Sequence, residues 1–232
     1  MIYLKRMSRW LLWVLCAHLV YLAIVMIWAN NAYETLHRSY KVVSTQLSPE
    51  FERILLQVED PRFYQHSGLD LSSGQGVTTL TSSLARDFFL YGQELQGVSG
   101  LIQGFYRRVF ECCKKIDIGR DVMALILNVK MPKSEQLNAY VMWLYMGQAN
   151  EKAVVGLATA SQQYFNQPLD QLARADFIRL VAMIKGPNLY HPHKNAGLLD
   201  ERANKITHLL DGQCQAQGWF DTDYPDCVEV SH

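Results

Sequence analysis

Residues 57–68, QVEDPRFYQHSG, bring together the side chains best suited to moving protons and holding anions. If this run is helical, Glu59, Phe63 and His66 stand at i, i+4 and i+7 and share one face of the helix, which the final Ser-Gly pair would end. A carboxylate beside an aromatic ring and an imidazole can be a general base with a tuned pKa. The alternative is a solvated helix end at which Glu59 pairs with Arg62, and the run alone favours this second interpretation.

Helices must position these groups, and the surrounding pattern indicates where the helices begin. Ser48 is a suitable N-cap, with Pro49 and Glu50 in the first turn, so a helix should begin there and run into residues 57–68. Glycines in the small-residue segment that follows indicate a loop, after which a second helix should begin near Thr79.

Farther along, apolar residues recur at helical spacing. One helix should run from Asp121 to Pro132, a second should start near Pro132, and the runs ATASQQYF, DQLARADFIRLVAMIK and ERANKITHLLDGQ continue the pattern. Residues 91–106 instead combine four glycines with apolar side chains, which predicts a mobile loop that touches membrane or ligand rather than core. No stretch alternates convincingly with period two, so the part after the N-terminal segment is predicted to be all-α, with a loop-like C-terminus.

The N-terminal segment from Trp10 to Trp28 contains no Asp, Glu, Lys or Arg. About 20 residues at roughly 1.5 Å each span the hydrocarbon layer of a membrane, about 30 Å thick. Lys5, Arg6 and Arg9 precede it, so the short N-terminus should stay in the cytoplasm. A cleaved signal peptide is the alternative, but its apolar region would be shorter and followed by a small-residue cleavage site. We therefore expect an uncleaved anchor.

Composition excludes some classes of function. Lys+Arg and Asp+Glu each total 22, so the overall charge gives no reason to expect nucleic-acid binding. No CxxC or HxxxH spacing is present, so no structural zinc is expected. Cys214 and Cys227 flank a loop near the C-terminus and could form a disulfide in an oxidising compartment.

Several runs, taken in order, resemble the peptidoglycan glycosyltransferases of family 51, which occur alone as monofunctional transglycosylases and fused to a transpeptidase in penicillin-binding proteins. Residues 59–68 match the family's EDxxFxxHxG signature at every fixed position, and residues 76–87 are a weakened form of GGSTITQQLxKN. MALILNVKMPKSEQLNAYVMWLYMG resembles the family's helix pair, with Lys133 and Tyr140 matching, and GLATASQQYFNQP, LVAMIKGPNLYHP and ERANK follow in family order. Such ordered matches over roughly residues 48–210 are more specific than one short pattern.

The resemblance implies a lysozyme-like helical fold with a smaller membrane-touching jaw, and lipid II, a disaccharide-peptide on undecaprenyl pyrophosphate, as substrate. The family reaction inverts the anomeric carbon, because the acceptor's 4-hydroxyl attacks the lipid-linked end of the growing glycan. Glu59 corresponds to the general base, and Phe63 could help to desolvate its carboxylate. The charge of the leaving pyrophosphate requires Lys, Arg or a divalent cation, Mg or Mn, while no organic cofactor and no metal-ligating residues are expected.

The resemblance also assigns residues to substrate binding, namely Asp60, Phe63, His66, Thr79, Thr81, Arg86, Arg107, Arg108 and Lys185. Arg86 replaces the family's lysine after the second motif and could hold phosphate by bidentate contact, and Lys185 matches the lysine of the family's VKG segment. Ordinary structural roles stay open for each. The threonines could cap a helix, Arg86 could be a surface residue, Lys185 could offset a helix C-terminus, and His66 is better interpreted as a structural hydrogen-bonding residue than as an acid.

Some positions depart from the family. Its second essential carboxylate lies in an RKxxE motif, and the ungapped position for that glutamate is Arg120. Residues 107–111, RRVFE, match better and make Glu111 the second catalytic candidate, if CCKKIDIGR is an insertion. Serines at 82–83 replace paired glutamines, and Met142 replaces an asparagine. Loss of site residues from a kept fold is typical of an inactive relative.

Two functions are therefore open. The first is a glycosyltransferase that uses Glu59 and Glu111 to polymerise lipid II, or a related undecaprenyl-linked saccharide, with release of undecaprenyl pyrophosphate. The second is a membrane-anchored pseudoenzyme that binds lipid-linked glycan or a cell-wall assembly partner. Hydrolysis of glycan, as lysozyme performs it, lacks supporting residues.

The expected organisation is a cytoplasmic N-terminus (1–9), a transmembrane anchor (10–29), a connector (30–47), a glycosyltransferase-like domain (48–210) and a C-terminal tail (211–232). This predicts a single-pass protein of the bacterial inner membrane with its soluble domain on the periplasmic side. Expected partners are the lipid-linked substrate, the membrane and other cell-wall synthesis proteins.

Overall fold

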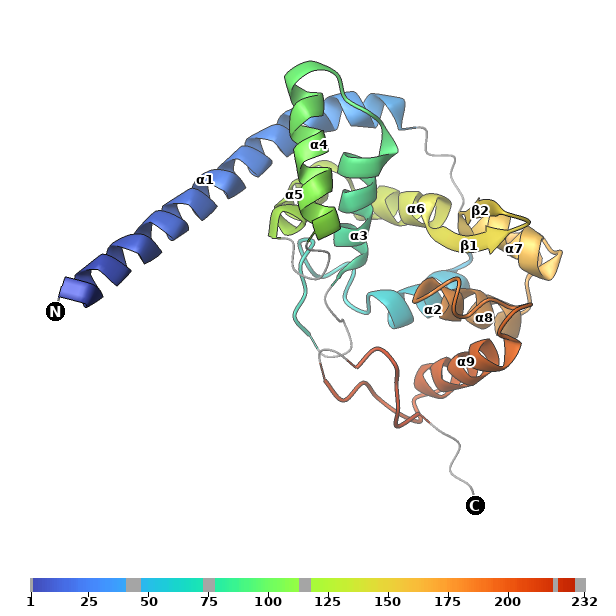
Figure 1. Cartoon of the computed structure of the whole chain (residues 1–232). Helices are drawn as coiled ribbons and strands as arrows, with labels where there is room; N and C mark the ends of the chain where they lie inside the picture. Colours follow the sequence, from blue (N-terminus) through green and yellow to red (C-terminus); the bar gives the residue numbers. More distant parts are fainter. Residues whose placement is uncertain (1, 41–46, 73–77, 113–117, 219–220, 228–232) are drawn as a thin grey trace. The chain divides into compact units, whose positions relative to one another are not determined.

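The computed structural model describes residues 2–40, 47–72, 78–112, 118–218 and 221–227 (Figure 1). Its elements in chain order are α1 (Ile2–Ser39), α2 (Pro49–Glu59), α3 (Leu80–Arg86), the π-helix η1 (Asp87–Gly92), α4 (Gly97–Cys112), α5 (Ile118–Lys130), α6 (Lys133–Trp143), β1 (Tyr145–Ala149), β2 (Lys152–Val155), α7 (Leu157–Phe165), the 3-10 helix η2 (Leu169–Gln171), α8 (Arg174–Ile184) and α9 (Ala196–Leu210). The chain divides into a first unit, Met1–Lys41 with Thr81–Lys130, and a second unit, Val42–Leu80 with Met131–His232.

In the first unit, α1 has two distinct parts. Its stretch Trp10–Ser39 is long and apolar enough to cross a membrane by length and composition. Trp10 and Trp13 are 73% and 72% exposed, whereas from Val25 onward one face is buried against α5, η1 and α4 (Figure 1). The predicted connector covers residues 30–47. Up to Ser39 it is a continuation of α1 that packs against the rest of the first unit, and residues 41–46 lie outside the described part.

Aromatic residues form the centre of this packing. The Trp28 ring lies 6.0 Å from that of Phe89 and 5.4 Å from that of Tyr106, between centroids. Its indole N–H donates to both the carbonyl oxygen (3.1 Å) and the hydroxyl (3.0 Å) of Ser99 on α4. Buried indole groups need such partners, so these bonds fix α4 against α1.

The prediction of a mobile loop over residues 91–106 is wrong for most of that range, because α4 begins at Gly97. The buried side-chain amide of Gln103 donates to the carbonyls of Phe89 and Gln93 at 2.8 Å and accepts from Leu95 N–H at 3.0 Å. Tertiary hydrogen bonds of this kind offset the poor helix propensity of glycine.

The second unit is a helical core, which confirms the all-α prediction. Side chains from α2, α6, α7, α8 and α9 form one apolar cluster. At its centre Phe51 and Phe177 stack with their ring centroids 3.9 Å apart. Helix α2 begins as predicted, because the Ser48 hydroxyl accepts from Phe51 N–H at 3.2 Å and Pro49 occupies the first turn.

The second unit also contains a short antiparallel hairpin, β1–β2. The search for alternating apolar and polar residues in the sequence did not predict it. Its strands span only five and four residues, and a bulge between Tyr145 and Gln148 breaks the alternation. Asn150 and Glu151 at its tip both have positive φ, 50° and 64°, as a type I′ turn requires.

The helix expected across residues 57–68 is also wrong. Helix α2 ends at Glu59, Asp60 is its C-cap with φ −161°, and residues 61–68 are turns and bends. The cause is Pro61, since the residue before a proline is pushed out of the helical region. Glu59, Phe63 and His66 therefore do not share a helical face.

The C-terminal segment is irregular, as expected, but it belongs to the core of the second unit. A disulfide joins Cys214 and Cys227, which confirms that pairing. Cys227 and Tyr224 are 2% and 3% exposed. The Tyr224 hydroxyl donates to the Val58 carbonyl at 3.2 Å, so the segment packs beside the end of α2.

Candidate functional site

Glu59 is the last residue of α2 and lies partly buried in the second unit. The hydroxyl of Tyr140, on α6, donates a long hydrogen bond of 3.4 Å to its Oε2. Burial raises the pKa of Glu59 to about 7, and Asp60 adds to this. The positive charge of Arg202, the Tyr140 hydrogen bond and the charge of Lys185 oppose the rise, in that order. Glu59 is thus a carboxylate that can take a proton near neutral pH.

Asp60 is fully buried and organises the loop that follows α2. Its carboxylate accepts from His66 Nε2 at 2.9 and 3.0 Å and from Leu80 N–H at 2.9 Å. His66 Nδ1 in turn accepts from Gly68 N–H at 2.9 Å, so in this geometry the ring proton sits on Nε2. The Thr79 hydroxyl donates to the Gly68 carbonyl at 2.6 Å. This network makes Asp60, His66 and Thr79 supports of the loop beside Glu59.

Phe63 is buried within the same loop and carries a cation on its ring. The ammonium group of Lys133, at the start of α6, lies 4.3 Å from the ring centroid. Burial lowers the pKa of Lys133 to about 8, against the opposing charge of Asp60. Near neutral pH this lysine is still a cation, in a partly desolvated position where it can attract an anion.

Lys185 follows α8 and is tied to the C-terminal segment. Its ammonium group donates to the Asp223 carboxylate and, at 3.0 Å, to the Thr222 hydroxyl. The hydrogen bond and charge of Lys185 hold the pKa of Asp223 below its usual range, with Arg202 adding to the effect. Lys185 therefore has an anionic partner in this conformation.

Arg202, on α9, is a buried cation in the same region. Its Nε donates to the Ala182 carbonyl and its Nη1 to the Thr222 carbonyl, both at 3.1 Å. The guanidinium carbon lies 5.4 and 6.0 Å from the ring centroids of Tyr190 and Tyr224. Two aromatic rings and two carbonyls thus fix the positive charge that most lowers the pKa of Glu59.

Two of the predicted basic residues, Arg86 and Arg107, make local contacts around η1 in the first unit. Arg86 makes a bidentate contact with Asp87, at 2.6 and 2.9 Å. Arg107 donates to the Leu90 carbonyl, pairs with Glu94 at 3.2 Å and lies over the Tyr91 ring at 5.9 Å. These contacts fix the ends of η1, a rare element often found at functional sites.

The remaining predicted residues of the first unit lie on α4, α3 and α5. Arg108 and Glu111 are exposed on α4, and Thr81 is buried in the first turn of α3. Arg120, the ungapped position for the second carboxylate, is buried on α5, 3.4 Å from Asp121. Most of the proposed insertion lies outside the described residues, so the pairing of Glu111 with Glu59 stays a prediction.

The described residues show no group of three or more His, Cys, Asp or Glu side chains that could hold a metal ion. The only carboxylate next to Glu59 in sequence, Asp60, is already engaged by His66 and Leu80. The described carboxylates near Glu59 thus do not by themselves form a site for a divalent cation, which would take most of its ligands from phosphate oxygens of a substrate.

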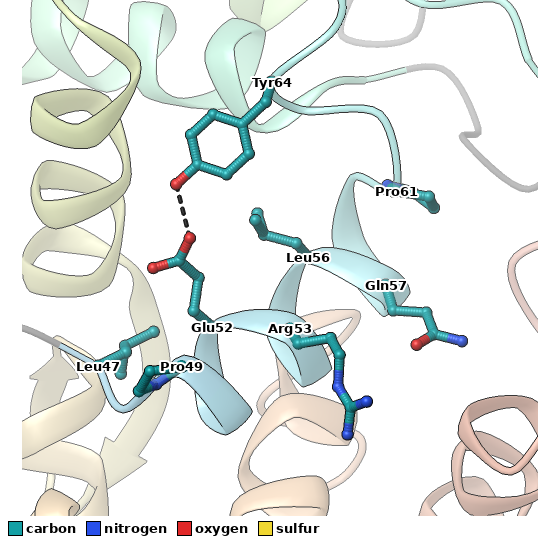
Figure 2. A pocket seen from close by; sticks show the side chains of 8 residues that line it. All are labelled: Leu47, Pro49, Glu52, Arg53, Leu56, Gln57, Pro61 and Tyr64. Carbon is teal, nitrogen blue, oxygen red and sulfur yellow. Dashed lines mark hydrogen bonds between the residues drawn. The ribbon is translucent and has the colours of Figure 1, made fainter.

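A hollow lies along α2 and is lined by residues other than those above (Figure 2). It has a volume of about 560 Å³, and Glu59 is not among its lining residues. Glu52 accepts from the Tyr64 hydroxyl at 2.6 Å within it, and burial together with this bond raises the pKa of Tyr64 to about 12. Arg53 and Gln57 complete the polar part of the wall.

Sequence reasoning does not single out three groups that the structure places around Glu59 or its loop. Lys133 and Tyr140 stand out only as matching letters in a helix pair, and Arg202 only as the second letter of ERANK. Their spacing along the chain carries no hint of proximity, since Tyr140 is 81 residues from its partner Glu59. The ordered family motifs are the one signal that could have identified them.

Comparison with known proteins identifies the family of this chain. A family model described as Transglycosylase matches residues 29–211. Penicillin-binding protein 1B of Escherichia coli (strain K12) is 30% identical over 173 residues, which cover 68% of this chain and 18% of that protein. Penicillin-binding protein 1B of Buchnera aphidicola subsp. Acyrthosiphon pisum is 34% identical over 163 residues, covering 68% and 20%. Penicillin-binding protein 1A of E. coli is 25% identical over 210 residues, covering 84% and 22%. The chain thus spans about a fifth of the length of these relatives.

Proposed function

Because this chain belongs to the transglycosylase family, we propose that it is a peptidoglycan glycosyltransferase that polymerises lipid II and releases undecaprenyl pyrophosphate. The observation that carries the proposal is the state of Glu59. Burial raises the pKa of this carboxylate to about 7, and fixed cations stand near it. A general base works best when its pKa lies near the working pH.

In the proposed reaction, Glu59 takes the proton of the acceptor's 4-hydroxyl as that oxygen attacks the anomeric carbon of the lipid-linked glycan. The new bond joins O4 to C1, and the bond from C1 to the pyrophosphate oxygen breaks with its electron pair on the leaving group. Attack from the opposite face inverts C1. Tyr140, at 3.4 Å from Glu59, is placed to hold the carboxylate in one orientation.

The leaving pyrophosphate gains negative charge as the bond breaks, and cations must stabilise it. In the second unit, Lys185, Lys133 and Arg202 are the candidates, since each is a cation close to Glu59 or its loop. In the first unit, Arg86 and Arg107 are candidates for the lipid-linked phosphates. Thr81, Arg108 and Glu111 stay proposals from the family motifs, Glu111 as the second carboxylate.

The long apolar helix α1 fits a substrate that stays in the membrane. We propose that α1 anchors the protein in the bacterial inner membrane as a single pass, with the rest of the chain after the membrane span on the periplasmic side. The Cys214–Cys227 disulfide supports this orientation, because disulfides persist in oxidising compartments.

A catalytically inactive binding protein is the second candidate. It is favoured by the departures in the site, above all Arg120 at the ungapped position of the second carboxylate, and by the carboxylate partners of Arg86 and Lys185. Such a protein would bind lipid-linked glycan or a cell-wall assembly partner without turnover.

The test is incubation of the purified full chain, in detergent, with labelled lipid II and Mg²⁺, followed by separation of glycan polymer from monomer. The proposal predicts polymer from the wild type. Binding of lipid II without any polymer would reject the enzyme and support the binding protein.

Glu111→Gln tests the second carboxylate in the same assay. We expect this variant to lose most of the polymer, while Glu34→Gln, another exposed glutamate of the first unit, serves as the matched control. Wild-type polymer from Glu111→Gln would show that the gapped motif match is wrong.

A further inference from the structure

The C-terminal segment of the second unit places an anion on the cations beside Glu59. The Asp223 carboxylate accepts from Lys185 and lies 3.7 Å from Nη1 of Arg202. Thr222 adds its hydroxyl to Lys185 at 3.0 Å and its carbonyl to Arg202 at 3.1 Å. Thr222 and Asp223, which are neighbours in sequence, therefore both provide oxygen atoms to Lys185 and to Arg202.

The charge of Asp223 suits this position. The hydrogen bond and charge of Lys185, followed by the charges of Arg202 and Lys205, keep the pKa of Asp223 low, so it is an anion at neutral pH. Its side chain is 68% exposed, and that of Lys185 is 28% exposed. An ion pair so open to water can be replaced by another anion at modest cost.

Several contacts hold the segment in this place. The disulfide from Cys227 to Cys214 closes its far end, and the Tyr224 hydroxyl donates to the Val58 carbonyl, one residue before Glu59. Asp221 accepts from the backbone N–H groups of Gln217 at 2.8 Å and Tyr224 at 3.0 Å.

Tyr224 also adopts φ +51°, which is unfavourable for a bulky side chain. Such a conformation persists only where surrounding contacts impose it, and it is found preferentially at functional sites.

We propose that residues 221–224 form an autoinhibitory strap, in which Asp223 imitates an anionic ligand on Lys185 and Arg202 and the Cys214–Cys227 disulfide keeps it there. A phosphate-bearing ligand must displace Asp223 to reach these cations. This proposal rests on the proposed function in one respect, namely that the ligand would be the pyrophosphate of the lipid-linked substrate. Because the strap is part of the chain, it competes at a high effective concentration.

The test is calorimetric titration of the full chain in detergent with inorganic pyrophosphate, in the absence of divalent cations. Asp223→Asn removes the competing charge and keeps the shape, so pyrophosphate should bind about 2- to 5-fold more tightly, the range expected for loss of an exposed ion pair. Asp223→Ala should behave in the same way.

Asp226→Asn is the matched control. It removes the same charge from the same segment, at an exposed residue, and should leave the pyrophosphate affinity unchanged. Lys185→Met combined with Asp223→Asn should abolish the gain, because the cation that Asp223 releases is then missing.

Reduction of the disulfide tests the role of the covalent closure. A trialkylphosphine with water converts the disulfide to two thiols and becomes the phosphine oxide. In the wild type, reduction should tighten pyrophosphate binding toward the value of Asp223→Asn. In the Asp223→Asn variant, reduction of the disulfide should change the pyrophosphate affinity little.

Unchanged or weaker pyrophosphate binding in Asp223→Asn would overturn the strap, and weaker binding would show that Asp223 positions Lys185 for the ligand. This titration involves no turnover, so the strap can fail while polymerisation of lipid II is still observed. Conversely, a strap confirmed in a chain that makes no polymer would reject only the proposed catalysis.

Discussion

At the scale of single residues, burial moves two groups of the second unit toward neutral pH from opposite sides. It raises the pKa of Glu59 to about 7 and lowers that of Lys133 to about 8. Both shifts have the same cause, since burial disfavours the charged form of each group. Between these values Glu59 is mostly a carboxylate and Lys133 mostly an ammonium, which is the pair of states that a base and an anion-binding cation require.

We therefore predict a bell-shaped pH dependence of kcat/KM for polymerisation. The rate should rise as Glu59 loses its proton near pH 7 and fall as Lys133 loses its own near pH 8. Lys133→Arg keeps its charge at high pH, so the falling limb should move upward by one pH unit or more. A falling limb that stays in place in this variant would show that Lys133 does not cause it.

The fully buried Asp60 gives a prediction about stability. Asn at this position replaces one of the two carboxylate oxygens by an NH2 group, which would face the donor His66 Nε2–H or Leu80 N–H. We expect Asp60→Asn to lower the free energy of unfolding by about 1–3 kcal/mol, the cost of a buried donor left unpaired. Urea unfolding followed by circular dichroism measures this, with the exposed Asp170→Asn as a control expected to change it by less than about 0.5 kcal/mol. Equal midpoints for the two variants would contradict the network.

At the scale of elements, α4 contains two glycines with opposite roles. A Cβ on Gly100 would lie 2.2 Å from the Leu95 carbonyl oxygen, whereas a Cβ on Gly104 would meet nothing within 4 Å. The first glycine permits the close approach of the preceding turn, and the second has no such role.

Gly100→Ala should therefore destabilise the protein by about 1–3 kcal/mol, as other overpacking substitutions do. Gly104→Ala should be neutral or stabilising by about 0.5–1 kcal/mol, because alanine is the better helix former. Urea unfolding of the two variants side by side measures the difference. A loss of the same size in both would mean that the contact with Leu95 is not the reason for Gly100.

The errors of sequence reasoning at this scale have local causes. The glycines of α4 imitate a loop, and only tertiary contacts such as those of Gln103 make the segment helical. Pro61 predicts the end of α2, because the residue before a proline is disfavoured in a helix. The helical spacing of Glu59, Phe63 and His66, taken alone, predicts instead that the helix continues. The first residues of helices and their apolar faces, by contrast, can be predicted from local chemistry. The hydrogen bond from Phe51 N–H to the Ser48 hydroxyl at the start of α2 is an example.

At the scale of the whole molecule, the exposed apolar surface of the first unit accompanies the candidate membrane helix. A groove of about 450 Å³ between α1 and α4 is lined almost wholly by apolar side chains. Leu101 and Phe105 of α4 border it and are 76% and 54% exposed. Surface of this kind indicates contact with a membrane or a lipid.

We predict that Leu101 and Phe105 lie in lipid in the full chain reconstituted into nanodiscs. Hydroxyl-radical footprinting measures this by the rate at which each side chain is modified. Leu101 should be modified far more slowly than Leu71 of the second unit, which is equally exposed at 77%. Similar rates for Leu101 and Leu71 would contradict the membrane contact.

The candidate site could be read from the sequence only in part. The carboxylate, its loop and Lys185 were available as motifs, but the role of Arg202 was not, because this residue comes from a later helix and lies near Glu59 only in the folded chain. The partner of Lys185 was not foreseeable at all. Asp223 belongs to a segment without pattern or motif, and only the disulfide and the burial of Tyr224 bring it to the site.

The most direct test of the central claim, that Glu59 is the base of a glycosyltransferase, is the initial rate of lipid II polymerisation by the full chain and by Glu59→Gln at pH 7.5. We predict a loss of at least about 100-fold, the usual contribution of a general base. Glu52→Gln, the same change on the same helix, should keep at least half of the rate. A rate in Glu59→Gln within a few-fold of the wild type would contradict the account.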